Sequence, residues 1–380
     1  MRRALLAAVV LAVALAGPVQ ASGTASGQSA TGPELDAAAW YLVGADGTVL
    51  AQRNSRRARA VASITKVMTA LVALEHARPS DVVRVSPLAA GVGGSTIFLR
   101  GGEELTVASL VRGALIPSAN DAAAALAVHV GGGSGARFVS LMNAKAQELG
   151  LRDTTFTNPH GLDQAGHVSS ARDATLLVKH ALGMPFLRDA LSRTSFSLAA
   201  SREFETTDDL LGWPALVGGK TGHTEDAGWS QAAAASGRGT VVYGTVLGGE
   251  TREARNAALK TLLVHGIASY RRIAAIDAGR TYAEAETGYG RPAVELVAPR
   301  TLTRTVLGTK SLLERVIAPR SVELPVRKGQ RLGRVEVWDG DVLVAKSRLV
   351  AAEEVTEPGL AGKAGWLARR TGANLWGIFT

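Results

Sequence analysis

Hydrophobic residues with helical spacing dominate the region that follows position 63. Apolar side chains recur there at offsets of 0, 3, 4, 7 and 10, which places them on one buried helix face. They are Ile64, Val67, Met68, Leu71 and Leu74. Further helices are predicted over residues 107–115, 121–130 and 136–149. The pattern therefore indicates a helix-rich central region.

Short apolar runs on either side of this region predict antiparallel strands. Residues 40–50 contain two such runs around an Asp-Gly pair, which is typical of a hairpin turn. A second hairpin is predicted over residues 229–247, and a helix over residues 252–273 closes the domain. Because strands, helices and strands follow one another, the fold class is predicted to be α+β, with helices packed on an antiparallel sheet. We place this domain at residues 34–275.

The chain becomes richer in strand patterns and in charge beyond residue 281. Pairs of valines flank Asp339-Gly340, which is a strong hairpin signal. Prolines at four positions interrupt the segment. We therefore predict a small, separate all-β domain over residues 282–356.

The N-terminus has the features of a secretory signal. Two arginines precede an apolar run over residues 4–16, and small side chains precede a cleavage point after Ala21. This run is shorter than the roughly 20 residues that a membrane-spanning helix needs. We therefore expect residues 1–21 to be a removable signal, the alternative being an uncleaved anchor, and residues 22–33 to be a flexible linker. The protein is predicted to be exported, to the periplasm or the extracytoplasmic face of the membrane.

The C-terminal tail, residues 359–380, combines apolar, aromatic and basic side chains. Trp366 and Trp376 lie among Lys363, Arg369 and Arg370. Tryptophan beside basic residues suits a lipid headgroup interface. We expect the tail to attach peripherally to the membrane surface, the alternative being a packed or frayed end.

Composition excludes several classes of protein. A content of 46% hydrophobic and 20% charged residues over 380 residues suits a chain with buried cores and excludes wholesale disorder. The net charge of +9 is scattered, and aromatics make up only 5%, so we expect no nucleic-acid partner. A basic protein near an anionic envelope surface is the simpler interpretation. Because the chain has no cysteine, disulfides, thiol chemistry and Cys-ligated metals are excluded.

Three short motifs contain residues suited to catalysis. In Ser63-Ile64-Thr65-Lys66, positions i and i+3 share a helix face, so the hydroxyl and the amine point the same way. A lysine can act as a base only if burial or a second cation keeps it neutral. The other two motifs are Ser118-Ala119-Asn120, between two helices, and Lys220-Thr221-Gly222-His223, on a strand. Each alone could be a helix cap or an edge strand.

The three motifs together are more specific evidence of function than any one of them alone. They occur in the order S-x-x-K, S-x-N, K-T-G, separated by 55 and then 102 residues, a set found in β-lactamases and penicillin-binding proteins. With its flanking residues, the chain resembles the low-molecular-mass penicillin-binding proteins, the serine D-alanyl-D-alanine carboxypeptidases of peptidase family S11. The resemblance covers about residues 35–356. The segments that carry it are 62–70, 118–122, 158–163, 167–173 and 325–330.

This resemblance implies a fold, a reaction and roles. It implies a serine β-lactamase/penicillin-binding-protein-like domain and hydrolysis of the terminal D-alanine of peptidoglycan stem peptides, with β-lactam antibiotics as covalent inhibitors and no cofactor. Ser63 would be the nucleophile, Lys66 its base, and Ser118 with Lys220 a proton relay. The substrate would be held by the following residues: Asn120, Thr221, Gly222, His223 and Arg255. Backbone N–H groups of Ser63 and His223 would form the oxyanion hole.

Several alternatives remain at this point. A β-lactamase needs a second base, usually in an E-x-x-L-N segment, and the sequence has none. A DD-endopeptidase with the same trio usually lacks the extra β domain, and a wall-binding scaffold would not need an intact trio. His160, His167 and Asp173 lack the spacing of an H-E-x-x-H zinc site, so we expect hydrogen bonding in a loop beside the site and no metal.

Overall fold

The computed structural model describes residues 11–14, 32–198 and 202–376. The predicted signal and linker therefore lie largely outside the described residues, and the last four residues of the tail also do. The chain divides into two compact units, Ser26–Tyr270 and Arg271–Thr380, the latter together with Met1–Ala25. Each unit is described by itself.

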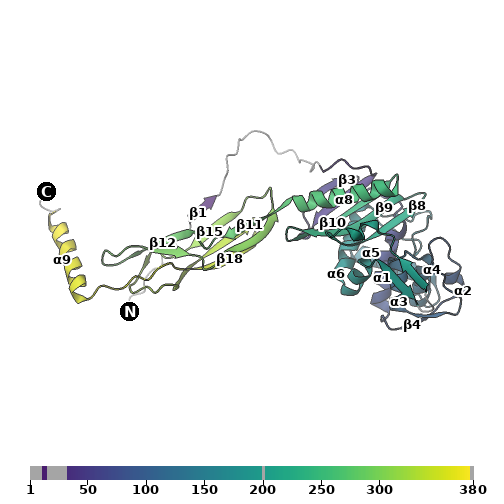
Figure 1. The fold of residues 1–380 in the computed structure, drawn as a ribbon, viewed down its shortest axis with the longest axis horizontal. Helices are drawn as coiled ribbons and strands as arrows, with labels where there is room; N and C mark the ends of the chain where they lie inside the picture. The colour runs from purple at the N-terminus through teal and green to yellow at the C-terminus, as the bar shows by residue number, and fades with distance from the viewer. Residues whose placement is uncertain (1–10, 15–31, 199–201, 377–380) are drawn as a thin grey trace. The chain divides into compact units, whose positions relative to one another are not determined.

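A five-stranded antiparallel sheet of strand order β3-β2-β10-β9-β8 forms the centre of the first unit (Figure 1). Its strands are β2 (Ala39–Gly44), β3 (Val49–Arg53), β8 (Leu216–Thr224), β9 (Gly228–Gly237) and β10 (Thr240–Gly249). Both hairpins predicted for this unit are confirmed, as β2–β3 and β9–β10. The predicted strand around Lys220 is confirmed as β8, which lies at the edge of the sheet.

Helices cover both faces of this sheet. They are η1 (Ala62–Ile64), α1 (Thr65–His76), α2 (Pro87–Ala90), α3 (Val107–Leu115), α4 (Asn120–Val130), α5 (Gly135–Glu148), α6 (Ala171–Gly183), α7 (Pro185–Leu191), η2 (Asp209–Gly212) and α8 (Arg252–Ala268). On one face, Leu262 and Leu263 of α8 pack over Gly244 of β10. On the other, Thr175 of α6 donates a hydrogen bond of 2.7 Å to Thr245. The main core lies on the α6 side, among α1, α3, α4 and α5.

One helix prediction needs correction, and helix α6 was missed. The helix predicted over residues 252–273 ends at Ala268, because Tyr270 begins strand β11 (Tyr270–Ile276), which pairs with β14 (Leu302–Leu307). Helix α6 was not predicted, although the Ser170 side chain caps its first turn by accepting a hydrogen bond from Asp173 N. Pairs of short strands were also missed: β4 (Val82–Arg84) with β5 (Glu104–Thr106), and β6 (Ser195–Leu198) with β7 (Arg202–Glu205).

The second unit is built on a seven-stranded sheet of order β1-β15-β17-β18-β13-β12-β16. Its strands are β1 (Leu11–Ala14), β12 (Thr281–Thr287), β13 (Val294–Val297), β15 (Leu313–Ile317), β16 (Ser321–Val322), β17 (Arg331–Asp339) and β18 (Val342–Ala351). The hairpin predicted at Asp339-Gly340 is confirmed as β17–β18. Its core includes Val335, Val337 and Leu349. Helix α9 (Leu360–Trp376) follows the sheet, and none of the helices in the described residues is long and apolar enough to cross a membrane.

Candidate active site

The S-x-x-K motif forms a tight turn that leads into α1. Ser63 is the middle residue of η1, and Ala62 before it has a φ of 48°, a strained conformation for a non-glycine residue. Lys66 lies in the first turn of α1, and its Nζ donates a hydrogen bond of 2.6 Å to Ser63 Oγ. The hydroxyl and the amine therefore face each other, as the spacing predicts.

Lys66 is enclosed by protein. Its side chain is completely buried, and Nζ also donates a 2.6 Å hydrogen bond to the carbonyl of His160. Burial lowers the pKa of Lys66 well below its ordinary value, and the nearby Lys220 cation lowers it further, while Asp121 opposes the shift. A buried lysine with a lowered pKa gives up its proton more readily than a lysine in water. It can accept the proton of the hydroxyl beside it.

The second motif lies between α3 and α4. Ser118 has a φ of 69°, and its Oγ accepts a hydrogen bond of 3.0 Å from Lys220 Nζ. Asn120 is the first residue of α4, and its side-chain amide donates to the carbonyl of Gly93 at 2.8 Å. Lys220 is 1% exposed, and burial, with Arg255 nearby, lowers its pKa to about 7 despite the opposing effect of Asp208. Two serine–lysine pairs thus lie in the same site.

Gly222 allows strand β8 to lie close to the η1 turn, which contains Ser63. A Cβ at this position would lie 2.7 Å from Val61 O, 3.1 Å from Ala62 Cβ and 3.1 Å from Ser63 N. Only a residue without a side chain allows this separation. The strand that carries Lys220 and the turn that carries Ser63 therefore form two walls of one pocket.

A pocket of about 260 Å³ lies between these walls. Its lining contains Ser63, Ser95, Ser118, Thr207, Thr221, Gly222, His223, Trp229, Arg252 and Arg255. The resemblance implied that Arg255 binds the substrate. The structure buries this side chain to 1% exposure, and its Nη2 lies 3.4 Å from Asp209 Oδ2. Thr221 and Thr207 share a hydroxyl–hydroxyl hydrogen bond of 2.6 Å. One end of the pocket is thus rich in hydroxyls and cations, which suits a carboxylate.

The structure also identifies pocket residues that the sequence analysis missed. Thr207, Ser95 and Arg252 belong to no motif, and only the fold brings them to the pocket. Trp229 follows the K-T-G strand, and its ring stacks on His223 with centroids 4.0 Å apart. Pairing the strand around Lys220 with the strand that follows it could have identified Trp229 as a pocket residue, because His223 and Trp229 are directly opposed in the β8–β9 register.

The two loop histidines form hydrogen bonds beside the site, as expected. His167 Nε2 lies 2.7 Å from Thr65 Oγ1, and its Nδ1 accepts from Thr157 N at 3.1 Å. His160 supplies the carbonyl that holds Lys66. Burial lowers the pKa of each histidine to about 4. Within residues 11–14, 32–198 and 202–376, no group of three or more His, Asp or Glu residues could hold a metal ion.

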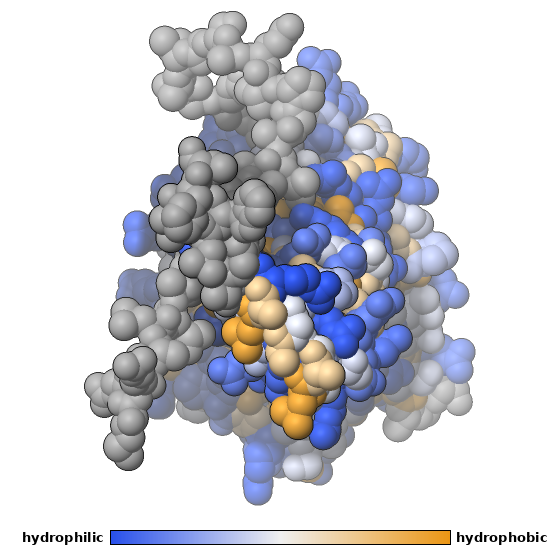
Figure 2. All heavy atoms as spheres, turned by 90° about the vertical axis from the view of Figure 1, so that its left-hand side faces the viewer, coloured by the Kyte–Doolittle hydropathy of each residue, from blue (hydrophilic) through white to orange (hydrophobic). Residues whose placement is uncertain are grey.

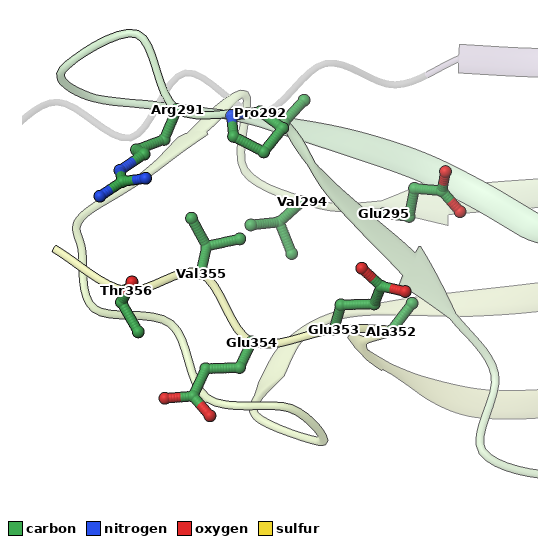
Figure 3. Close-up of a pocket in the computed structure, with 10 residues that line it drawn as sticks. Arg291, Pro292, Val294, Glu295, Ala352, Glu353, Glu354, Val355 and Thr356 are labelled. Atoms are coloured by element: carbon green, nitrogen blue, oxygen red, sulfur yellow. The ribbon is translucent and has the colours of Figure 1, made fainter. Parts of the chain in front are cut away.

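A second pocket, of about 380 Å³, lies in the β-rich unit (Figure 3). Val294 and Val355 point into it, whereas Glu353 and Glu354 lie around its rim. It contains neither a serine nor a lysine among its lining residues. The two motif serines, Ser63 and Ser118, line the pocket of the first unit instead.

A strained serine turn, a buried lysine and a K-T-G edge strand define the class of penicillin-binding, acyl-transferring serine enzymes. The chain belongs to the D-alanyl-D-alanine carboxypeptidase family, peptidase family S11, whose model matches residues 26–251. Residues 270–357 match the penicillin-binding protein 5 C-terminal domain. The chain is therefore a serine-type D-Ala-D-Ala carboxypeptidase with the fold class predicted from its sequence.

Individual relatives agree with this assignment. The chain is 33% identical to the D-alanyl-D-alanine carboxypeptidase DacF of Bacillus subtilis, over 82% of this chain and 84% of the relative. The crystal structure of penicillin-binding protein 5 from Haemophilus influenzae matches 86% of this chain and 99% of its own length, with 29% identity and a TM-score of 0.63. The Streptomyces K15 DD-transpeptidase matches 63% of this chain and 99% of its own length, with 28% identity and a TM-score of 0.60.

Proposed function

We propose that Ser63 forms the acyl-enzyme with the penultimate D-alanine of a peptidoglycan pentapeptide stem. The neutral amine of Lys66 takes the Ser63 proton as Oγ attacks the carbonyl carbon of the terminal peptide bond. The 2.6 Å hydrogen bond between Lys66 and Ser63 is the single observation that most strongly supports this step. A β-lactam would acylate the same hydroxyl, and its adduct would persist because the ring-opened product stays attached.

Departure of the terminal D-alanine requires a proton on its nitrogen. Ser118 Oγ accepts a hydrogen bond of 3.0 Å from Lys220, so it can pass a proton from this lysine to the leaving group. As the peptide C–N bond breaks, Ser118 gives its proton to the nitrogen and regains one from Lys220. The proton that Lys66 took from Ser63 replaces the one that Lys220 gave up, so both lysines regain their starting states. Water then attacks the ester while Lys66 takes the proton of the water and passes it to the departing Ser63 Oγ, which releases the shortened stem. Asn120 holds the side amide of the substrate.

Recognition of the terminal carboxylate is the basis for carboxypeptidase specificity. Thr221 lines the pocket beside Lys220, and the buried Arg255 lies at the same end. Charge-assisted hydrogen bonds of this kind are about twice as strong as neutral ones. The terminal D-alanine of a pentapeptide stem presents such a carboxylate next to the bond that is cut. The geometry therefore suits release of a residue that carries a free carboxylate.

Product analysis tests this proposal directly. Mature protein is incubated with a pentapeptide-stem muropeptide, with cross-linked dimers, and with the pentapeptide plus a D-amino acid acceptor, and the products are identified by mass spectrometry. We expect loss of one D-alanine from the pentapeptide. Cleavage of dimers with the pentapeptide untouched would establish an endopeptidase, and acceptor exchange without hydrolysis would establish a transpeptidase. No turnover of any substrate would support the scaffold alternative.

The oxyanion formed at the carbonyl oxygen needs backbone donors, for which we propose the N–H groups of Ser63 and His223. Gly222→Ala is expected to lower kcat by about 10²-fold, because its Cβ would displace the turn and removal of one oxyanion donor costs about 10²–10³-fold. The measurement is steady-state kcat with a D-Ala-D-Ala peptide. Gly135→Ala is the matched control, since its Cβ would meet nothing within 4 Å. Unchanged kcat for Gly222→Ala would contradict this assignment.

We also propose that the exported enzyme attaches to the membrane surface through α9. Leu360 and Leu367 are 86% and 55% exposed. Figure 2 shows apolar side chains grouped on the face turned to the viewer. Trp366 contacts Tyr289, with ring centroids 5.5 Å apart, and Lys363 lies over the same Tyr289 ring. These contacts hold the start of the helix against the β-rich unit. The helix thus presents apolar side chains together with a cation, as a headgroup interface requires.

Deletion of residues 359–380 is expected to abolish cosedimentation with vesicles that contain anionic phospholipid. The paired replacement Leu360→Glu and Leu367→Glu should weaken binding at least about tenfold per leucine, because burying each is worth about 1.5–3 kcal/mol. Leu343→Glu, at a similarly exposed leucine of β18, is the matched control and should bind like the unaltered protein. Retention of vesicle binding by the truncated chain would refute α9 as the anchor.

A further inference from the structure

Asp208 is a buried acidic residue that the proposed mechanism does not use. It is 5% exposed and directly follows Thr207, which lines the pocket. Its Oδ1 accepts a hydrogen bond of 2.9 Å from Leu210 N and so caps η2. Its Oδ2 is buried without a hydrogen-bond donor. A buried carboxylate with an oxygen left bare is unfavourable unless cations offset the loss of water.

Two buried cations of the active site face this carboxylate. Thr207, the residue before Asp208, shares a 2.6 Å hydrogen bond with Thr221 next to Lys220, and Asp209, the residue after it, lies 3.4 Å from Arg255. Lys220 on β8 and Arg255 on α8 are therefore the charged neighbours of Asp208, and the side-chain amide of Gln231 on β9 lies beside it. Lys220 is 1% exposed and Arg255 is also 1% exposed. Water screens these charges poorly, so their attraction to Asp208 is stronger than on the surface. Asp208 thus offsets part of the positive charge at the cationic end of the pocket.

The charge on Lys220 also affects the base. Lys220 faces Asp208, Arg255 and Lys66, and Asp208 is the neighbour that favours its protonated form. Lys66 in turn faces Lys220, which favours the neutral amine, and Asp121, which opposes it. The ionised form of Asp208 therefore favours protonated Lys220, and protonated Lys220 favours the neutral amine of Lys66, while burial raises the pKa of Asp208 itself. The two lysines need these opposite states for the proposed reaction.

We propose that Asp208 is a positioning residue that acts through Lys220 and Arg255: it favours the charged form of Lys220 and attracts the Arg255 guanidinium at the carboxylate end of the pocket. The residue touches neither the substrate nor the reacting atoms. This inference rests on the proposed roles of Lys220 as proton donor and of Arg255 as carboxylate partner. It assigns a function to the segment that precedes η2, which none of the three motifs contains.

The Asp208→Asn variant tests this role through its pH dependence. Asparagine keeps the shape and an oxygen that can cap η2 but removes the charge, so the pKa of Lys220, about 7 in the unaltered enzyme, should fall. For a fall of one unit, the protonated fraction of Lys220 drops about twofold at pH 6 and about tenfold at pH 8. We therefore expect kcat/KM to fall several-fold more at pH 8 than at pH 6, with KM raised for the peptide.

The ratio of kcat/KM at pH 6 to that at pH 8 is the decisive quantity, because a misfolded fraction lowers both values equally. Asp189→Asn is the matched control: Asp189 is a half-exposed carboxylate paired with Arg193, and it does not line the pocket. The control should keep the ratio of the unaltered enzyme. An unchanged ratio in Asp208→Asn would overturn the inference. Failure of the unaltered enzyme to release D-alanine would instead overturn the proposed function.

Discussion

Replacing Ser63 with alanine is expected to abolish D-alanine release and the covalent penicillin adduct together. The hydroxyl is the only group at the centre of the η1 turn that can form the acyl ester, and Lys66 Nζ lies 2.6 Å from it. Loss of a nucleophile costs at least about 10⁴-fold in related acyl-transfer machinery. Single-turnover release of D-alanine and intact-protein mass after penicillin treatment are the two measurements.

Ser118→Ala distinguishes the two serines that pair with lysines. Ser118 accepts its hydrogen bond from Lys220 and not from Lys66, so this variant should acylate slowly yet still carry the adduct. Peptide mapping of the unaltered enzyme should locate the penicilloyl group on the peptide that contains Ser63. An adduct on Ser118, or a fully active Ser63→Ala enzyme, would reverse the assigned roles. The control is the unfolding temperature of both variants, which should match that of the unaltered enzyme if they are folded.

The periodicity of the sequence was sufficient where an element depends on its own residues. The apolar positions from Ile64 to Leu74 predicted the face of α1, and the Asp-Gly pairs predicted two hairpins. The end of α8 could not be predicted in this way. Residues 270–276 form a strand because they pair with β14, a distant partner that a local pattern does not reveal.

The same distinction applies to the site. The i, i+3 spacing predicted that Ser63 and Lys66 would face each other, since a helical turn decides that contact. Thr207 and Asp208 lie near the pocket only because the segment before η2 packs against β8. The Thr207–Thr221 hydrogen bond shows this contact. Lys220 meets Ser118 across 102 residues of sequence. Only recognition of the motif trio, and not residue spacing, could suggest that pair.

Lys66→Ala is expected to lower the rate of acylation by about 10²–10⁴-fold, the usual worth of a general base. The unaltered enzyme should gain activity as the pH rises through the lowered pKa of Lys66, because only the neutral amine can take the Ser63 proton. The alanine variant should lack this rise. The measurement is the second-order rate of penicillin acylation between pH 5 and pH 9.

Lys66→Arg separates a base from a fixed positive charge. Arginine stays protonated at every accessible pH, so it can supply a cation but cannot accept a proton. If Lys66 acts as a neutral base, the arginine variant should be as slow as Lys66→Ala over the whole pH range. Acylation restored by arginine would show that the site needs a cation there, and the role of Lys66 as base would be wrong. Because position 66 is completely buried, the melting temperature of the arginine variant must accompany the rate.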